Sequence, residues 1–174
     1  MTFLPKALLI VAALGLAACN NPDRFGAGGP GADGGMGAGG IDTTGLGDPN
    51  DPNSIAYFNQ RIGDRVLFAV DQSTLSAEGR QVLVGQASWL MSHPDYAIII
   101  EGHADEQGTR EYNLALGARR AAAVQDFLIS QGIAPSRMKT ISYGKERPLE
   151  VCSDETCYAK NRRAVTVLSM GAGA

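Results

Sequence analysis

The densest group of polar side chains in this sequence lies between residues 102 and 113, in the run GHADEQGTREYN. The run joins a predicted buried strand to a predicted long helix, and such a junction is a common ligand site in α/β folds. Asp105 supplies a carboxylate in the loop, and Arg120 supplies a guanidinium from the helix. Together they could hold a zwitterion, because a carboxylate accepts from an ammonium group while a guanidinium holds a carboxylate through two hydrogen bonds.

The position of Arg120 on its helix indicates how its side chain can be used. Arg120 lies on the flank of the predicted apolar face, which is made up of Leu114, Gly117, Ala121, Val124 and Leu128. We therefore expect its stem to lie against apolar surface and its guanidinium to be free at the helix margin. A plain salt bridge between Asp105 and Arg120 accounts for the same pair equally well, so a structural role stays open.

Two further residues near this run raise the question of an enzyme. Glu101 and Asp105 could form the carboxylate pair of a cell-wall glycosidase, and His103 could be a general base. However, Glu101 lies in a predicted strand whose polar side its side chain can simply face. No nucleophile or second base accompanies His103 in the sequence. We therefore expect a binding protein without catalytic residues.

The elements that must position these residues follow from hydrophobic periodicity and helix caps. Strands are predicted at residues 65–70, 97–101, 138–143 and 164–169. One helix is predicted from the N-cap Ser76 to His93, and a longer one from Thr109 to Gln131, closed by Gly132. The order β-α-β-α-β-β predicts an α+β domain, a two-layer α/β sandwich with helices packed on one face of a small mixed four-stranded sheet.

Residues 1–18 have the features of a secretory signal peptide. Lys6 precedes an apolar run too short to span a bilayer, which ends in small residues directly before Cys19. The pattern resembles the lipobox of bacterial lipoproteins, in which the cysteine is lipidated and becomes the new N-terminus. The alternative is a soluble secreted protein in which Cys19 is incidental. We expect the lipid anchor, and Asn20 after it favours the outer membrane over retention in the inner membrane.

Residues 19–54 are predicted to form a flexible tether behind the lipidated cysteine. Eleven of the 22 glycines fall between Gly26 and Gly47, and apolar side chains are almost absent there. Such a segment cannot bury enough surface to offset the entropy of ordering it. The folded domain is therefore expected at residues 55–170, at the end of this tether.

Charge and cysteine content narrow the class of protein further. A formal net charge of −3 among 174 residues disfavours a nucleic-acid partner and a polybasic membrane patch. Once Cys19 carries lipid, Cys152 and Cys157 remain, and two neighbouring cysteines usually pair in an oxidising compartment. A two-thiolate metal site would need further ligands, and neither His93 nor His103 lies beside the pair in sequence. We predict a structural disulfide between Cys152 and Cys157, and no metal or other cofactor.

Three stretches of the chain carry a family resemblance: GHADEQGTREYNLALGARRAAAV, ISYGKERP and NRRAVTVL. They resemble the OmpA-like domain, in particular the version found in the peptidoglycan-associated lipoprotein family, over residues 55–169. The resemblance implies non-covalent binding of the diaminopimelate side chain of the peptidoglycan stem peptide. It also implies a place in the Tol–Pal system of envelope integrity and cell division, with a TolB-like periplasmic protein as partner.

Carried over position by position, the resemblance places the family's diaminopimelate-binding Asp at Asp105 and its Arg at Arg120. The other pocket residues that it implies are Asp71, Thr109, Asn113 and Leu116. The run Asn-Arg-Arg at residues 161–163 could face either the glycan or a protein partner. A periplasmic protein-interaction module with incidental wall contact is the alternative function, and the sequence does not separate the two.

Overall fold

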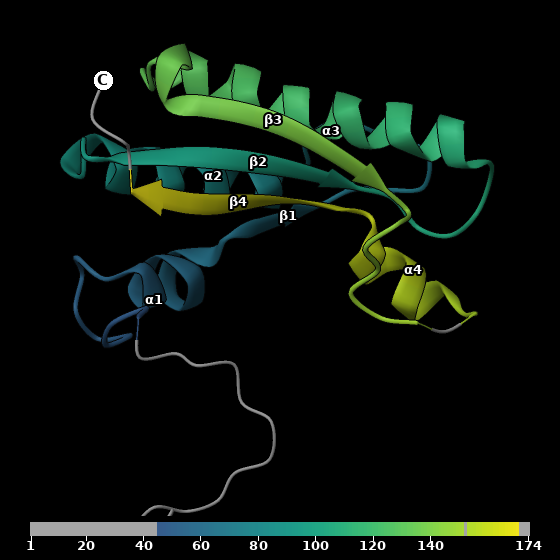
Figure 1. Ribbon diagram of the computed structural model, residues 1–174, viewed down its shortest axis with the longest axis horizontal. Helices are drawn as coiled ribbons and strands as arrows, with labels where there is room; N and C mark the ends of the chain where they lie inside the picture. The colour runs from purple at the N-terminus through teal and green to yellow at the C-terminus, as the bar shows by residue number, and fades with distance from the viewer. Residues whose placement is uncertain (1–44, 152, 171–174) are drawn as a thin grey trace, which may run out of the picture. The chain divides into compact units, whose positions relative to one another are not determined.

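The computed structural model describes residues 45–151 and 153–170, and it shows one mixed sheet with helices packed against it (Figure 1). The strands are β1 Arg65–Leu67, β2 Tyr96–His103, β3 Met138–Gly144 and β4 Arg163–Met170, in the order β1-β4-β2-β3. The helices are α1 Ile55–Tyr57, the π-helical η2 Phe58–Gly63, α2 Ala77–Ser92, α3 Arg110–Ser130, the 3-10 turn η3 Pro135–Arg137 and α4 Glu155–Asn161. The predicted two-layer α+β sandwich with a mixed four-stranded sheet is confirmed.

Strand β2 lies at the centre of the sheet and organises the core. It runs parallel to β3, with Ile98 opposite Met138, and antiparallel to β4, with Ile98 opposite Leu168. Ile98 and Ile100 are buried in the core with α2 and α3 side chains such as those of Leu83, Leu90, Val124 and Leu128. Because side chains alternate along a strand, Glu101 and His103 lie on the opposite face of the sheet.

The predicted helix ends are found where the sequence indicates them. The hydroxyl of Ser76 accepts from the Gly79 N–H at 3.0 Å, and the hydroxyl of Thr109 accepts from the Tyr112 N–H at 3.2 Å. Gly132, directly after the last residues of α3, has a φ of 98°, which favours glycine. Local side-chain chemistry therefore fixes where α2 and α3 begin and where α3 ends.

Helix α3 approaches β2 most closely at a pair of glycines. A Cβ atom at Gly102 would lie 1.8 Å from the carbonyl oxygen of Gly117, and one at Gly117 would lie 2.4 Å from the Ser142 hydroxyl oxygen. No other residue fits at such separations without moving the backbone. The glycine pair therefore sets the distance between α3 and the end of β2.

Some parts of the fold differ from the prediction. Strand β1 ends at Leu67 rather than at residue 70, because the chain turns away from β4 and Asp71 adopts a left-handed φ of 56°. Strand β2 instead continues beyond residue 101 to His103. The short segments α1, η2 and α4 are additions to the prediction, since helices of three to seven residues hardly show a helical period in the sequence.

Residues 48–54, at the end of the predicted tether, fold against α2, and we call them the N-terminal clasp. The indole Nε1 of Trp89 donates to the carbonyl oxygen of Pro52 at 2.8 Å, and Nε2 of His93 lies 3.1 Å from Oδ1 of Asn53. The rings of Trp89 and His93 are stacked, with centroids 3.9 Å apart. The folded part of the chain therefore begins before the expected boundary.

The predicted signal peptide, the lipidated Cys19 and the tether up to residue 44 lie outside the described residues. Cys152 lies outside them as well, so its disulfide with Cys157 stays a prediction. Within the described ranges, no helix is both long and apolar enough to cross a membrane.

Candidate ligand-binding site

A pocket of about 310 Å³ opens between the segment after β1, the loop after β2 and the start of α3. It is lined by Val70, Asp71, Asp105, Gln107, Gly108, Tyr112, Asn113 and Leu116. The sequence predicts four of these residues, namely Asp71, Asp105, Asn113 and Leu116. The structure therefore brings two carboxylates to one pocket from loops that are far apart in the chain, whereas Thr109 and Arg120 do not line it.

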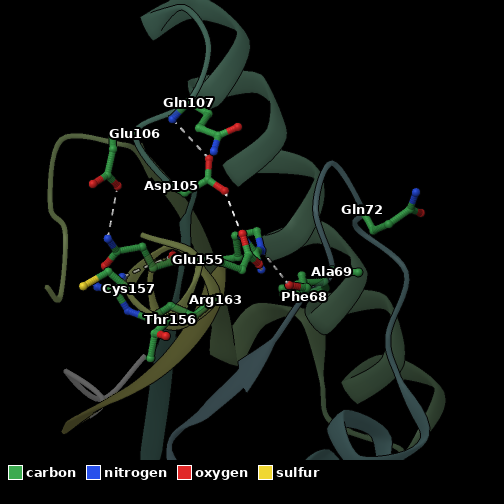
Figure 2. Close-up of polar contacts among 12 residues, drawn as sticks. Phe68, Ala69, Gln72, Asp105, Glu106, Gln107, Glu155, Thr156, Cys157 and Arg163 are labelled. Carbon is green, nitrogen blue, oxygen red and sulfur yellow. Dashed lines mark hydrogen bonds and ion pairs between the residues drawn. The ribbon is translucent and has the colours of Figure 1, made fainter. Parts of the chain in front are cut away.

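Asp105 is held from two sides. Its Oδ1 accepts from the Gln107 N–H at 3.3 Å, and its Oδ2 accepts from Nη1 of the buried Arg162 at 3.2 Å. Arg162 also donates from Nε to the Phe68 carbonyl oxygen and from Nη2 to the Glu155 carboxylate. Figure 2 shows Asp105 beside Gln107, with Phe68 and Glu155 around the same cluster. Burial lowers the pKa of Arg162, but the bonds to Glu155 and Asp105 outweigh burial and raise it, so the guanidinium is charged.

This pairing corrects two sequence-based interpretations. The sequence left open a plain salt bridge between Asp105 and Arg120. This alternative is wrong, because Asp105 forms its ion pair with Arg162. The run at residues 161–163 does not face a glycan or a partner, because Asn161, Arg162 and Arg163 are all buried. Sequence reasoning missed Arg162 because adjacent arginines look like surface charge. Arg162 lies directly before β4, and the neighbouring strand β2 leads into the pocket. This position in the sequence is the signal that could have identified it.

Arg120 is fully buried, with an exposed fraction of 0%, so the expected free guanidinium at the helix margin is wrong. Its hydrogen bonds go to backbone carbonyl oxygens, namely those of Gln72 at 2.8 Å, His103 at 2.7 Å and Ala69 at 3.2 Å. Burial lowers the pKa of Arg120 to about 10, and the nearby charge of Asp105 opposes this shift. Arg120 is therefore charged at neutral pH.

No carboxylate balances the charge of Arg120 at contact distance. In the described part of the chain it forms no ion pair, and two of its five N–H groups make no hydrogen bond. A buried charge without a charged partner is costly, so such a group is a candidate for binding an anionic ligand. Two of the three carbonyl groups that it contacts belong to residues 69–72, so this loop separates it from the pocket.

Asp71 lies in the same loop in a strained backbone conformation. Its φ of 56° falls in the left-handed region, which residues other than glycine rarely adopt and which is often found at functional sites. Its Oδ1 accepts a hydrogen bond from the hydroxyl of Tyr112 on α3, and this bond raises the pKa of the phenol. The contact ties the loop to the first turn of α3. Tyr112 is a pocket residue that the sequence analysis did not single out.

The predicted residues at and near the start of α3, Thr109, Asn113 and Leu116, have different roles. Thr109 is the N-cap of α3 and is not among the residues that line the pocket. Asn113 is buried, and its Nδ2 donates to the carbonyl oxygens of Asp105 at 3.2 Å and Gln107 at 2.8 Å, which holds the loop in place. Leu116 is buried and gives the pocket an apolar wall.

The two residues considered for catalysis lie away from the pocket. Neither Glu101 nor His103 lines it, and Oε2 of Glu101 lies 3.5 Å from Nε2 of the buried His103. Burial, followed by the charges of Arg163 and Arg147, lowers the pKa of His103 to about 4. Glu101 and Asp105 therefore do not form a carboxylate pair in one site. Among the described residues, no group of His, Cys, Asp and Glu side chains could hold a metal ion.

Comparison with known proteins places the chain in a family. A family model described as the OmpA family matches residues 67–162. The peptidoglycan-associated lipoprotein of Agrobacterium fabrum is 51% identical over 169 residues, which cover 97% of this chain and 89% of that protein. The chain belongs to the peptidoglycan-associated lipoproteins of the OmpA family. The peptidoglycan-associated lipoprotein of Legionella pneumophila is 39% identical and is covered over 93% of each chain.

Solved structures agree with this membership. The crystal structure of the peptidoglycan-associated lipoprotein of Burkholderia pseudomallei superposes with a TM-score of 0.62 at 40% identity, covering 70% of this chain and 98% of that one. The C-terminal domain of MotB from Helicobacter pylori has a TM-score of 0.58 at 22% identity, over 63% of this chain and 86% of that one, and shows the shared fold alone. The names of the peptidoglycan-associated lipoproteins describe a lipoprotein and not an enzyme.

Proposed function

We propose that this chain is an outer-membrane lipoprotein whose periplasmic domain binds peptidoglycan non-covalently, through the diaminopimelate side chain of the stem peptide. It thereby anchors the outer membrane to the cell wall as part of the Tol–Pal system, with a TolB-like periplasmic protein as partner. The observation that carries the proposal is the buried charge of Arg120, which has no carboxylate partner in the described residues and lies behind a pocket with two carboxylates. The names of the relatives support peptidoglycan as the partner.

The far end of diaminopimelate matches this distribution of charge. It carries an ammonium and a carboxylate on one carbon, and we assign the ammonium to Asp105 with Asp71 as a second carboxylate. The ligand carboxylate takes the two unused N–H groups of Arg120. For this to happen the loop at residues 69–72 gives up a carbonyl contact, and the strain at Asp71 lowers the cost of that movement. Leu116 and Val70 offer apolar surface to the methylene groups of the side chain.

The anchor in this proposal is the lipidated Cys19, followed by the glycine-rich tether. Each buried CH₂ group of an acyl chain contributes roughly 0.8 kcal/mol, so two or more chains hold the protein stably without a membrane-spanning helix. The disulfide between Cys152 and Cys157 in this proposal joins the segment before α4 to the helix. Mass spectrometry of the unreduced protein would show an acylated N-terminal fragment and no free thiol at either position.

Calorimetric titration of the intact protein with two synthetic stem peptides tests the binding step. One peptide contains diaminopimelate, and the other contains lysine, which keeps the ammonium and lacks the far carboxylate. Loss of a charge-assisted hydrogen bond lowers affinity by about 10- to 100-fold, so the lysine peptide should bind that much more weakly. Binding of both peptides with equal affinity would contradict the role of Arg120, and binding of neither would contradict the proposed function.

Substitution of Arg120 provides the matched test of the site. Arg120→Lys keeps the charge and loses the planar fork, so it should reduce the difference between the two peptides. Arg119→Lys, one residue earlier on the exposed side of α3, is the control and should leave that difference unchanged. Thermal unfolding of both variants shows whether the fold is retained.

A further inference from the structure

The carboxylate that we assign to the ligand ammonium is not free in the structure. Asp105 shares the guanidinium of Arg162 with a second carboxylate, that of Glu155 at the start of α4. The side chain of Glu155 is 65% exposed and does not line the pocket, whereas Arg162 is 6% exposed. One buried cation therefore connects the pocket to a surface carboxylate outside it.

Arg162 is fixed in a position from which it can serve both carboxylates. Its Nε donates to the carbonyl oxygen of Phe68 at 3.2 Å, which leaves one terminal nitrogen directed to Asp105 and the other to Glu155. The guanidinium is planar and rigid, so it cannot turn wholly toward one partner while the Phe68 bond persists. The division of its charge is therefore a property of the folded domain.

Helix α4 is fixed relative to the pocket loop by a second contact. The buried Asn161 donates from Nδ2 to Oε2 of Glu106 at 3.3 Å and to the carbonyl oxygen of Glu150 at 2.8 Å. Figure 2 shows Glu106 and Asp105 side by side in the pocket loop, with Glu155 close to both. Asn161 and Glu155 both belong to α4, so the bonds to Glu106 and to Arg162 connect the same helix to the pocket loop at two points.

The charges of this cluster decide what the pocket can bind. One guanidinium between two carboxylates leaves one negative charge over, and that charge is available to an ammonium group. Without the Glu155 carboxylate, Arg162 alone would neutralise Asp105, and only Asp71 would remain in the pocket to attract the ammonium end of a zwitterion.

We propose that Glu155 is a positioning residue that sets the preference of the pocket for an ammonium group by withdrawing part of the Arg162 charge from Asp105. This inference rests on the proposed function, because it concerns the same pocket and the same ligand. It adds a residue outside the pocket that acts only through Arg162, and it makes α4 part of the recognition apparatus.

Three stem peptides that differ only at the end of one side chain separate recognition of the ammonium group from recognition of the carboxylate. The diaminopimelate peptide has both charges, the lysine peptide has only the ammonium, and an aminopimelate peptide has only the carboxylate. The charges at the peptide termini are the same in all three and cancel in the comparison. Calorimetric titration of the intact protein with each peptide gives the contribution of each group.

Glu155→Gln keeps the size of the side chain and removes its charge. It should weaken the lysine peptide by about fivefold or more, while the aminopimelate peptide binds as well as before or better. Glu155→Asp retains the charge and should keep the wild-type order of affinities. Glu146→Gln is the matched control, because Glu146 forms an exposed ion pair with Arg110, 2.9 Å between Oε1 and Nε, and has no contact with Arg162.

The outcomes distinguish this inference from the function on which it rests. If the wild-type protein binds the peptides and Glu155→Gln changes all three affinities by one factor, or none of them, Glu155 has a structural role only and the inference is wrong. If the wild-type protein binds none of the peptides, the proposed function itself fails, and the role of Glu155 in recognition fails with it. A change of the same size and selectivity in Glu146→Gln would show a general effect of surface charge and would also overturn the inference.

Discussion

At the scale of single residues, two buried arginines have opposite surroundings within one site. The hydrogen bonds of Arg120 go only to backbone carbonyl groups, and its guanidinium lies over the ring of Phe68. Arg162 instead binds one carbonyl group and two carboxylates. A carbonyl dipole balances a full charge less well than a carboxylate does. The first arginine therefore keeps its attraction for an incoming anion, while the second holds a carboxylate of the domain in place.

The lowered pKa of His103 predicts that the folded domain loses stability in mild acid. Its pKa is lowered to about 4 from an ordinary 6.5, chiefly by burial. The unfolded chain takes up this proton as the pH falls through 6.5, and the folded protein does so only near pH 4. The contribution of His103 to the free energy of unfolding is therefore constant above pH 6.5 and falls by about 3 kcal/mol between pH 6.5 and 4.

Urea unfolding of the wild type and of His103→Phe from pH 4 to pH 8 measures this effect. The wild type should lose about 3 kcal/mol relative to the variant on acidification. Parallel curves for the two proteins would show that other groups carry the acid sensitivity.

Two substitutions of Asp71 should have the same effect on ligand affinity and different effects on the stability of the domain. Asp71→Gly and Asp71→Ala both remove the carboxylate, so both should weaken the diaminopimelate peptide to the same degree. Only glycine adopts the φ of 56° without steric cost, so the alanine variant should be less stable than the glycine variant by about 1 kcal/mol. Thermal unfolding of the two variants checks this order, and equal stabilities would show that the loop relaxes to another conformation.

The sequence identifies the two carboxylates that line the pocket better than it identifies the arginines. The place of Asp105 in the pocket can be predicted, because the residue lies in a polar run between a strand and a helix. The burial of Arg120 cannot be predicted in the same way. Helical periodicity indicates which face of α3 carries Arg120, but it does not indicate that the loop at residues 69–72 contacts it. Arg162 is missed for a related reason, since its partners Asp105 and Glu155 reach it only through the tertiary fold.

At the scale of elements, the contact of α3 with β2 predicts a large effect from one methyl group. Gly102→Ala would place a Cβ 1.8 Å from the carbonyl oxygen of Gly117, and the backbone must separate to relieve it. Overpacking of this kind costs about 3 kcal/mol, and the displaced start of α3 should also weaken ligand binding. Gly79→Ala is the control, because its Cβ would lie no closer than 3.4 Å from any neighbouring atom.

Urea unfolding and peptide titration of both glycine variants test this prediction. Gly79→Ala should change the free energy of unfolding by less than about 1 kcal/mol and leave binding intact. Wild-type binding by Gly102→Ala would show that α3 can move from β2 without disturbing the pocket.

Long, capped elements are predictable from this sequence, and short ones are not. Ser76 and Thr109 mark the starts of α2 and α3 because their hydroxyl groups cap amide groups three residues on. The seven residues of α4 are too few to show a period, although Asp154 at its N-cap accepts from Thr156 and Cys157. The early end of β1 is likewise hidden, since residues 68–70 have the apolar character of a strand but leave the sheet to reach Arg120.

At the scale of the whole domain, the N-terminal clasp should behave as a separate cooperative part. Trp89→Phe keeps an aromatic ring beside Phe58 and removes the donor to the Pro52 carbonyl group. Hydrogen exchange should then become faster at residues 48–54, with a loss of about 1 kcal/mol in local stability. Binding of the diaminopimelate peptide should stay at its wild-type affinity, because the pocket lies at the other end of β2.

Hydrogen exchange measured residue by residue distinguishes this from a global effect. Equal acceleration throughout α3 would mean that Trp89 supports the whole core rather than the clasp, and the prediction would be wrong.

The clasp and the pocket lie at opposite ends of the central strand, near Tyr96 and beyond His103 respectively. In the proposed function, a pull acts between a membrane anchor before the clasp and a ligand held in the pocket, and it is therefore directed along the strands of the sheet. The chain from the clasp reaches the pocket residues Val70 and Asp71 through β1, which pairs antiparallel with β4, so the load falls on this ladder of hydrogen bonds in shear. Bonds loaded in this way must break together rather than one after another. The topology of the sheet thus gives the domain the mechanics of a link under tension.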